Sequence, residues 1–211
     1  MSLILASSSP FRKAVLERLD IDFSTVSPDI DESRHAGETP HDLVYRLSAE
    51  KAREVAKTHN GLIIASDQVA TLASGNGSND EVLTKPHTRE NAVKQLQKSA
   101  GNTVTFLTSL ALFNTETGTL QNHVEIFKVV FRLLTDLEIN NYLDKEDTLK
   151  CAGSFKSEGL GIALFERMEG DDPNSLIGLP TIRLINMLAK ENVHILWAFC
   201  LLTSTKILHQ G

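Results

Sequence analysis

Short apolar runs alternate with segments of helical periodicity at the start of the chain. Residues 3–6 (Leu-Ile-Leu-Ala) are an apolar run typical of a buried strand. Three serines follow, and from Pro10 to Leu19 the apolar positions recur at helical spacing. Ser9 suits an N-cap, and Pro10 suits the first helical position. The pattern therefore predicts a strand, a tight turn and a helix.

A second strand, a long helix and a third strand are predicted before residue 70. Residues 21–27 predict a second strand, which an acidic loop follows. Thr39 and Pro40 open a long helix, predicted to end near residue 59 before an Asn-Gly pair. Residues 62–65 are apolar throughout and predict a buried strand, closed by the polar residues 66–68.

Two long segments of the second half alternate between apolar and polar positions, with helical segments around them. The predicted elements are a helix from Thr88 to near Gly101, antiparallel strands over 103–113 and 123–134, a helix that Thr135 and Glu138 open as a capping box, a strand over 162–167 and a helix over 180–190. At 211 residues, this order predicts one α/β domain with room for two lobes.

Composition narrows the class of protein. The chain is 41% hydrophobic and 23% charged, as is ordinary for a globular enzyme, and its net charge of -6 argues against a long nucleic-acid track. Two cysteines, Cys151 and Cys200, are too few for a disulfide framework. No signal-peptide pattern and no apolar run of about 18 residues is visible. We therefore expect a cytoplasmic protein whose partners include neither membrane nor nucleic acid.

Two segments fall outside the regular pattern. Residues 74–80 (Ser-Gly-Asn-Gly-Ser-Asn-Asp) predict a flexible loop. Residues 193–211 form an unexpectedly apolar tail, which we separate from a main domain over residues 1–192. The tail fits packing on the domain, packing on a second subunit, a docking module or an unstructured end, and the sequence leaves these open.

The turn after the first strand is the first candidate site. A helix N-terminus that follows a strand offers free N–H groups and a partial positive charge, and Ser9 adds a hydroxyl. Arg12 and Lys13 lie in the first helical turn, where the helix dipole disfavours cations. Their presence there points to a nearby anion, although a plain capped helix also fits. The glycines of a P-loop are absent.

Two further candidates carry opposite charges. Lys51 continues an apolar row with four-residue spacing from Leu43 and Leu47, so it faces the core side of its helix or covers apolar surface with its stem. Asp67 directly follows a predicted buried strand, at the edge where open α/β sheets bind ligands. A carboxylate there can bind Mg²⁺ or orient a water, or it simply caps a turn.

Glu32 and Lys85 lie in predicted loops and are compatible with solvated charges. The seven histidines show no metal-ligand spacing, and no Ser–His–Asp arrangement can be recognised. Taken together, several cations and two carboxylates fit phosphate chemistry, in which cations bind the phosphates and carboxylates bind a metal or a water.

Several short motifs follow one another in a fixed order between about residues 3 and 190. The first is residues 3–12, which ends in Ser-Ser-Ser-Pro-Phe-Arg. The others are Asp31-Glu32, Glu50-Lys51-Ala52, Ser66-Asp67-Gln68-Val69, Thr84-Lys85-Pro86, residues 151–159 (Cys-Ala-Gly-Ser-Phe-Lys-Ser-Glu-Gly) and Ile177-Gly178-Leu179-Pro180. Each motif alone is weak, but the ordered set resembles that of the Maf family of nucleotide pyrophosphatases.

The resemblance implies an α/β fold related to the inosine-triphosphate pyrophosphatases, with a mixed twisted sheet, flanking helices and two lobes around a cleft. It implies hydrolysis of a nucleoside triphosphate between the α and β phosphates, with Mg²⁺ or Mn²⁺ as cofactor and often a homodimer. The implied roles are proton acceptor and metal ligand for Asp67, metal or water ligand for Glu32, and neutralisation of the phosphates by Lys51 and Lys85. Ser9, Arg12 and Lys13 would face the phosphates.

Within that family, Asp67-Gln68 resembles the branch that prefers 7-methyl-GTP, whereas Asp-Thr is typical of the branch that takes dTTP and UTP. Phe11, Gln68 and Glu158 are the implied specificity residues. A cationic methylated guanine favours an aromatic face and a carboxylate. Phe11 departs from the branch, which often has Trp there. The alternatives are a dTTP/UTP pyrophosphatase of the same fold and a non-catalytic nucleotide-binding regulator of cell division.

Overall fold

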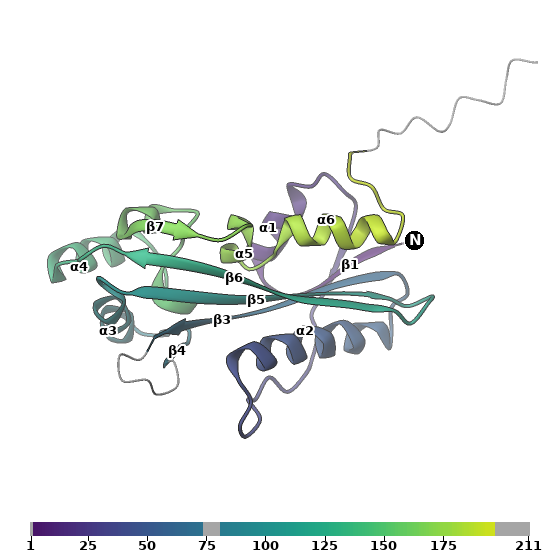
Figure 1. Ribbon diagram of the computed structural model, residues 1–211, viewed down its shortest axis with the longest axis horizontal. Coiled ribbons are helices and arrows are strands. Elements are labelled where there is room, and N and C mark those ends of the chain that lie inside the picture. The colour runs from purple at the N-terminus through teal and green to yellow at the C-terminus, as the bar shows by residue number, and fades with distance from the viewer. Residues whose placement is uncertain (1, 74–80, 197–211) are drawn as a thin grey trace, which may run out of the picture.

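The computed structural model describes residues 2–73 and 81–196. In these ranges the chain forms one mixed seven-stranded sheet with strand order β2-β1-β3-β5-β6-β7, and β4 pairs with β3 off this path (Figure 1). The strands are β1 (Leu3–Ala6), β2 (Ser24–Val26), β3 (Leu62–Leu72), β4 (Glu81–Leu83), β5 (Thr103–Asn114), β6 (Leu120–Phe131) and β7 (Phe165–Glu169). Strands β1, β2 and the start of β3 are parallel, and the remaining pairs are antiparallel.

Helices flank this sheet and begin where the sequence provides caps. They are α1 (Pro10–Glu17), α2 (Pro40–Ala56), α3 (Arg89–Ser99), α4 (Asp136–Lys145), α5 (Pro173–Ile177) and α6 (Thr181–Lys190), with 3-10 turns at Ala152–Ser154 and Leu160–Leu164. The side chains of Ser9, Thr39, Thr88 and Thr135 each accept a hydrogen bond from the backbone N–H three residues on. All four predicted caps are therefore confirmed, including the Thr135–Glu138 capping box.

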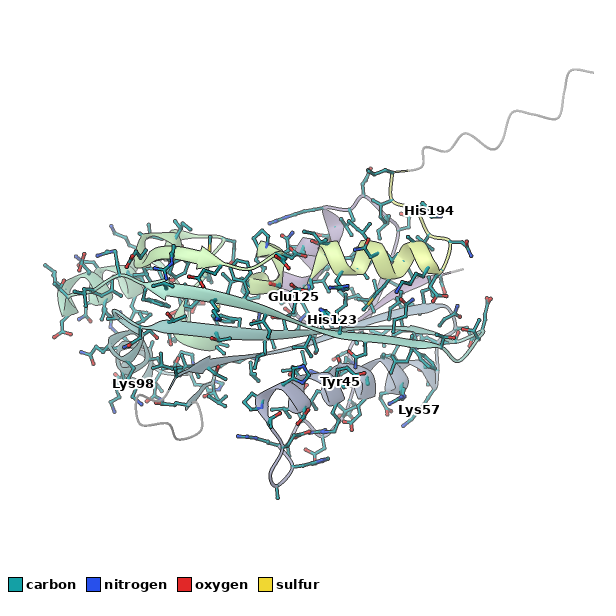
Figure 2. All side chains as sticks on the ribbon, viewed as in Figure 1. Tyr45, Lys57, Lys98, His123, Glu125 and His194 are labelled. Carbon is teal, nitrogen blue, oxygen red and sulfur yellow. The ribbon has the colours of Figure 1, made fainter. Side chains whose placement is uncertain are left out.

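Alternate residues of β3 bury against helices on opposite faces of the sheet. Leu62 and Ile64 pack in one cluster with residues of α1 and α6, whereas Ile63 and Ala65 pack in another with residues of α2. Figure 1 shows α2 on one side of the sheet, with α1, α5 and α6 on the other, and Figure 2 shows side chains filling both layers. These two clusters form the core of the first lobe.

The far ends of the long strands form the second lobe. Ala70 and Leu72 of β3 pack there with Phe106 of β5 and with residues of α3 and α4. Phe155 lies at its centre and makes edge-to-face contacts with Phe106 and other phenylalanines. The strands β3 and β5 thus run through both lobes.

Between the two lobes, the paired strands become polar. Ser66, Asp67 and Gln68 of β3 lie opposite Leu110, Ser109 and Thr108 of β5. Among the described residues, β3 pairs on its other edge with β1 at Leu62–Ile64 and with β4 at Ala70–Leu72, and no strand covers the segment between. The polar segment therefore lies at a gap in the sheet, where a ligand can reach it.

Several predicted element bounds were wrong. The third strand does not close at residues 66–68 but continues to Leu72, because β5 pairs with it throughout. Residues 21–23 lie outside β2, and the predicted strand over 162–167 is a 3-10 turn followed by the start of β7. The short elements β4 and α5 carried no sequence signal that we recognised.

Other expectations concern the termini and the long loop. The loop 74–80, Cys200 and most of the apolar tail lie outside the described residues, and of the tail only residues 193–196 are described. Val193 and Ile195 pack against the α1/α6 cluster, whereas Leu196 is exposed. Cys151 is a free cysteine. Among the described helices, none has the length and apolar character needed to cross a membrane.

Candidate active site

A cleft of about 680 Å³ lies where the polar segments of the sheet meet the β1–α1 turn. Its lining comes from segments far apart in the sequence: Ser7 to Arg12, Glu32, Lys51, Asp67 to Val69, Val82 to Lys85, and Lys150 to Glu158 with gaps. Nine of the ten residues that the sequence nominated line it, namely Ser9, Phe11, Arg12, Glu32, Lys51, Asp67, Gln68, Lys85 and Glu158.

Lys51 is the centre of the charged floor of this cleft. Its Nζ lies 2.6 Å from Oδ1 of Asp67 and 2.7 Å from Oε1 of Glu32. The Lys51 side chain is 7% exposed and that of Asp67 is 12% exposed, whereas that of Glu32 is 60% exposed. The apolar row on α2 therefore points its lysine inward, as one of the two sequence interpretations held, and Glu32 has a partner that its loop position did not reveal.

Asp67 faces Lys51 because strand geometry alternates the two faces of the sheet. Asp67 lies on the same face of β3 as Ile63 and Ala65, which pack against α2. Its backbone N–H donates to Ser109 Oγ at 3.1 Å, and that hydroxyl donates to the Asp67 carbonyl at 3.2 Å. The carboxylate is therefore on a fixed strand in the middle of the sheet, a more rigid position than the strand end that the sequence predicted.

The β1–α1 turn brings hydroxyls and a guanidinium to the same cleft. Ser9 Oγ accepts from the backbone N–H of Arg12 at 3.4 Å, and Ser7 Oγ accepts from the backbone N–H of Ser9 at 3.1 Å. Arg12 Nη1 also approaches Ser7 Oγ at 3.5 Å. Burial lowers the pKa of the Arg12 guanidinium from its ordinary value, and the carboxylates of Asp67 and Glu32 oppose this shift. A desolvated guanidinium of this kind favours an anionic ligand.

The Arg12 guanidinium is oriented by the Gly178 carbonyl, which is far from it in the sequence. The Gly178 carbonyl accepts from Arg12 Nε at 2.9 Å and from Ser66 Oγ at 2.8 Å. Gly178 ends α5 with φ 114°, a backbone conformation that favours glycine. A Cβ there would lie 3.4 Å from Arg12 Nε. The glycine therefore allows the close approach that holds the guanidinium.

Lys13 does not share the position of Arg12. It is exposed, is not among the cleft-lining residues, and its Nζ lies 3.6 Å from Glu17 one helical turn on. Neighbouring residues of a helix point about 100° apart, so Lys13 leaves the helix in a different direction from Arg12. The structure thus places nine of the nominated residues at the cleft and Lys13 outside it.

Apolar side chains and the nominated specificity residues also line the cleft. Phe11, Phe106, Phe155 and Leu176 line it, and Glu158 is an exposed carboxylate at the same cleft. The side-chain nitrogen of Gln68 donates to Thr108 Oγ1 and to the Ser175 carbonyl, at 2.8 Å each. Gln68 therefore attaches α5 to the sheet as well as lining the cleft.

Lys85 lies on a segment that α3 holds from both sides. Gln95 Nε2 donates to the Thr84 carbonyl at 2.9 Å, and Asn91 Nδ2 donates to the Pro86 carbonyl at 3.0 Å. The carbonyls before and after Lys85 are therefore fixed, although the side chain itself is exposed. This places an exposed cation at the cleft.

The sequence analysis did not nominate several polar residues that line the cleft, among them His87, Lys150 and Cys151. His87 follows Lys85 by two positions and has a φ of 60°, which is uncommon outside glycine, while Lys150 and Cys151 come from the loop after α4. Burial raises the pKa of the Cys151 thiol to about 11, so the thiol stays protonated at neutral pH. Lys150 directly precedes the motif at residues 151–159, and this adjacency was the signal that could have identified it.

The donor set suits a hard divalent cation only in part. Among residues 2–73 and 81–196, no group of three or more His, Cys, Asp and Glu side chains is close enough to hold a metal ion. Asp67 and Glu32 nevertheless bring two carboxylates together around Lys51. Mg²⁺ is typically bound by one or two carboxylates together with substrate phosphates and waters, so these two residues fit a cation that arrives with a nucleotide.

Fold and site together define an α/β protein with an interlobe cleft built for a phosphate-bearing ligand. Residues 2–191 match the family model described as Maf-like protein, and the chain belongs to this family. It is 49% identical, over 194 residues, to the "7-methyl-GTP pyrophosphatase" of Vibrio vulnificus (strain CMCP6), a match that covers 92% of this chain and 97% of that relative.

Solved structures show a partial likeness. The Staphylococcus aureus Ham1 protein is 15% identical, with a TM-score of 0.43, over 62% of this chain and 72% of its own. The nucleoside-triphosphatase / dITP/XTP pyrophosphatase of Mycobacterium abscessus is 20% identical, with a TM-score of 0.38, over 62% of this chain and 74% of its own.

Proposed function

We propose that this protein hydrolyses a nucleoside triphosphate, with 7-methyl-GTP as its preferred substrate, to the nucleoside monophosphate and pyrophosphate. One observation carries the proposal: Lys51 joins the carboxylates of Asp67 and Glu32 on the floor of a cleft that Arg12 and Lys85 also line. The relative that is 49% identical is named for this activity.

Asp67 is the proposed proton acceptor for the attacking water. Its carboxylate is fixed in the middle of β3 and faces the cleft, as a general base requires. Lys51 orients that carboxylate through the 2.6 Å contact. A water deprotonated there attacks the α-phosphorus, the bond to the bridging oxygen breaks, and pyrophosphate leaves with the electron pair.

The cations of the cleft are the proposed phosphate ligands. Arg12 offers a guanidinium that can bind two phosphate oxygens at once, and the N-terminus of α1 adds the partial charge of its free N–H groups. Lys85 and Lys51 add two ammonium groups. These groups stabilise the charge that builds up on the leaving pyrophosphate, which is the main task of a phosphoryl-transfer site.

Asp67 and Glu32 are the proposed ligands of a divalent cation, Mg²⁺ or Mn²⁺, bound together with the triphosphate. Such an ion supplies charge neutralisation and polarisation of phosphate oxygens. Because Lys51 contacts both carboxylates, it also holds the two candidate ligands at a common point.

Phe11 and Glu158 are the proposed recognition groups for the base. A methylated guanine is cationic, so an aromatic face and a carboxylate both stabilise it more than they stabilise guanine itself. Phe11 and Glu158 line the same cleft, and Glu158 is exposed there.

The decisive test is pyrophosphate release with Mg²⁺ or Mn²⁺ across 7-methyl-GTP, GTP, dTTP and UTP, beside an Asp67→Asn variant. We expect 7-methyl-GTP to be turned over with the highest kcat/KM and the variant to be inactive. Orthophosphate in place of pyrophosphate would exclude cleavage between the α and β phosphates. A lead for dTTP or UTP would assign the other branch, and binding without turnover would favour the regulator. Light scattering tests the predicted homodimer separately.

A further inference from the structure

Glu32 is held at the catalytic floor by a segment that has little else to fix it. Residues 31–37, between β2 and α2, are all exposed and contain no helix or strand. Even so, Glu32 Oε1 lies 2.7 Å from Lys51 Nζ. Since apolar burial does not hold this segment, its polar contacts must determine where Glu32 lies.

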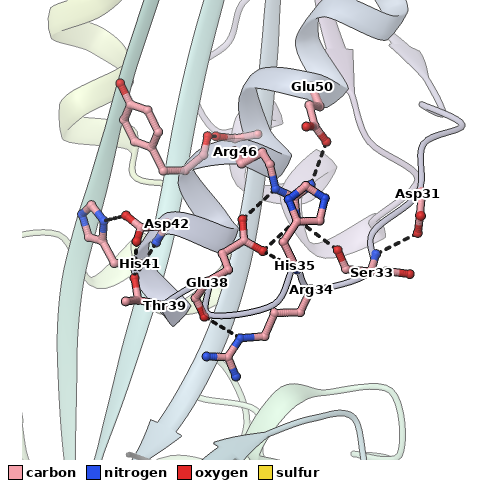
Figure 3. A network of polar contacts seen from close by, with 12 residues as sticks. Asp31, Ser33, Arg34, His35, Glu38, Thr39, His41, Asp42, Arg46 and Glu50 are labelled. Atoms are coloured by element: carbon pink, nitrogen blue, oxygen red, sulfur yellow. Dashed lines mark hydrogen bonds and ion pairs between the residues drawn. The ribbon is translucent and has the colours of Figure 1, made fainter.

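Arg46 joins this segment to α2 (Figure 3). Its Nε donates to Glu38 Oε1 at 2.7 Å, and its Nη2 donates to Glu38 Oε2 at 2.9 Å and to the Ser33 carbonyl at 3.0 Å. The side chains are little exposed, 18% for Arg46 and 8% for Glu38. The guanidinium therefore binds the chain at Ser33, directly after Glu32, and at Glu38, which directly follows the segment.

Glu38 continues the same network inside the segment. Its carboxylate accepts from the His35 backbone N–H at 3.0 Å, and its carbonyl accepts from Arg34 Nε at 2.7 Å. Ser33 N–H donates to Asp31 Oδ1 at 2.9 Å. These contacts fold the segment into a compact turn around the Arg46–Glu38 pair (Figure 3).

The anchor and the catalytic ammonium are on one helix. Arg46 and Lys51 both belong to α2, five residues apart, and Arg46 Nη1 is fixed in turn by Glu50 Oε2 at 2.9 Å. The helix is rigid over this distance, so an arginine that binds the segment also sets the distance from Glu32 to Lys51.

We propose that Arg46, acting with Glu38, is a positioning residue that holds Glu32 against Lys51 and Asp67. Arg46 is not among the residues that line the cleft, so it acts through Glu32 rather than on the substrate. The inference rests on the proposed function for its catalytic consequence. Its chemistry requires an arginine, because a lysine ammonium cannot donate to both carboxylate oxygens and a carbonyl in a planar fork.

A double-mutant cycle measures whether Arg46 acts through Glu32. Arg46→Met is expected to lower kcat for pyrophosphate release by about 10- to 100-fold, as is usual for a residue that orients a metal-binding carboxylate. KM should change less. In a Glu32→Gln background the same substitution should change kcat by less than about threefold, since the group it positions is already lost. Another tenfold loss in that background would overturn the proposal.

Glu50→Gln is the matched control. It removes the charge from one Arg46 contact on the helix and leaves the contacts to Ser33 and Glu38, so we expect kcat within about threefold of wild type. Glu38→Gln removes the charge and one of the two acceptor oxygens of the Arg46–Glu38 pair, so it should reproduce at least part of the loss seen with Arg46→Met. Arg46→Lys should recover only part of the activity. If Arg46→Met does not fold, Glu38→Gln and Arg46→Lys complete the cycle.

Hydrogen exchange of the backbone over residues 31–38 gives a readout that needs no activity. Arg46→Met and Glu38→Gln should speed exchange in this segment, whereas Glu50→Gln should leave it unchanged. Wild-type exchange in both variants would overturn the proposal whatever the kinetics show. If wild-type protein hydrolyses no nucleotide, the proposed function fails, and exchange alone then decides whether Arg46 anchors the segment.

Discussion

The Nζ of Lys51 lies between Asp67 and Glu32, at 2.6 Å from one carboxylate and 2.7 Å from the other. The three residues come from α2, β3 and an exposed segment before α2. Substituting Lys51 breaks both contacts, whereas substituting one carboxylate leaves the other contact in place. The variants can therefore be ranked by their expected loss of stability.

Lys51→Met should lower the free energy of unfolding by about 3 kcal/mol, because the buried Asp67 carboxylate loses its ammonium partner. Asp67→Asn should cost less, since Lys51 keeps its contact with Glu32. Urea denaturation of the two variants measures the difference. Equal losses would mean that the contact with Glu32 does not compensate Lys51 for the loss of Asp67. Asp67→Asn should still lower kcat by roughly 10²- to 10⁴-fold, as expected for loss of a general base.

Arg12 and Lys13 are adjacent cations, but we expect their substitution to have different effects on activity. Arg12→Ala should lower kcat/KM by about 10- to 100-fold, the usual effect of losing hydrogen bonds to a charged group. Lys13→Ala should change kcat/KM by less than about threefold, because Lys13 lies outside the cleft beside Glu17. Steady-state kinetics on 7-methyl-GTP decide the comparison. An equal loss in both variants would show that Lys13 reaches the phosphates after all.

Glu158→Gln should reduce the discrimination between 7-methyl-GTP and GTP rather than the rate of hydrolysis. The substitution removes a negative charge beside the expected cationic base, so the ratio of kcat/KM for 7-methyl-GTP over GTP should fall by about tenfold. The kcat with GTP should stay close to wild type. Parallel assays on the two nucleotides measure the ratio. An unchanged ratio would place base recognition elsewhere, with Phe11→Ala as the next variant.

The Arg46–Glu38 pair makes stability depend on pH in the acid range. Hydrogen bonds from Arg46 lower the pKa of Glu38 from its ordinary value of 4.5 to about 2. A lowered carboxyl pKa stabilises the fold above pH 4.5, and this contribution is lost as pH falls from 4.5 towards 2. Glu38→Gln should therefore lower the thermal midpoint at pH 7 but have little effect near pH 2. A constant difference between the two proteins across this range would contradict the assignment.

Local sequence patterns were sufficient to predict the helix starts and the types of residue at the site. Ser9, Thr39, Thr88 and Thr135 predicted helix starts correctly, because each cap bonds to a backbone group three residues away. The four-residue apolar row on α2 also gave an inward Lys51 as one of two interpretations, because helix periodicity determines which face a residue occupies but not how its side chain ends.

Three features depend on contacts between distant segments and could not be predicted locally. They are the length of β3, the partner of Glu32 and the separation of Arg12 from Lys13. Strand β3 continues past Asp67 because β5, some 40 residues on, pairs with it, and no local pattern encodes that pairing. Glu32 reaches Lys51 because Arg46 and Glu38 hold its segment on α2. Arg12 reaches the cleft because the Gly178 carbonyl accepts from its guanidinium. Each of these contacts joins distant segments, and only the folded chain brings such segments within hydrogen-bonding distance.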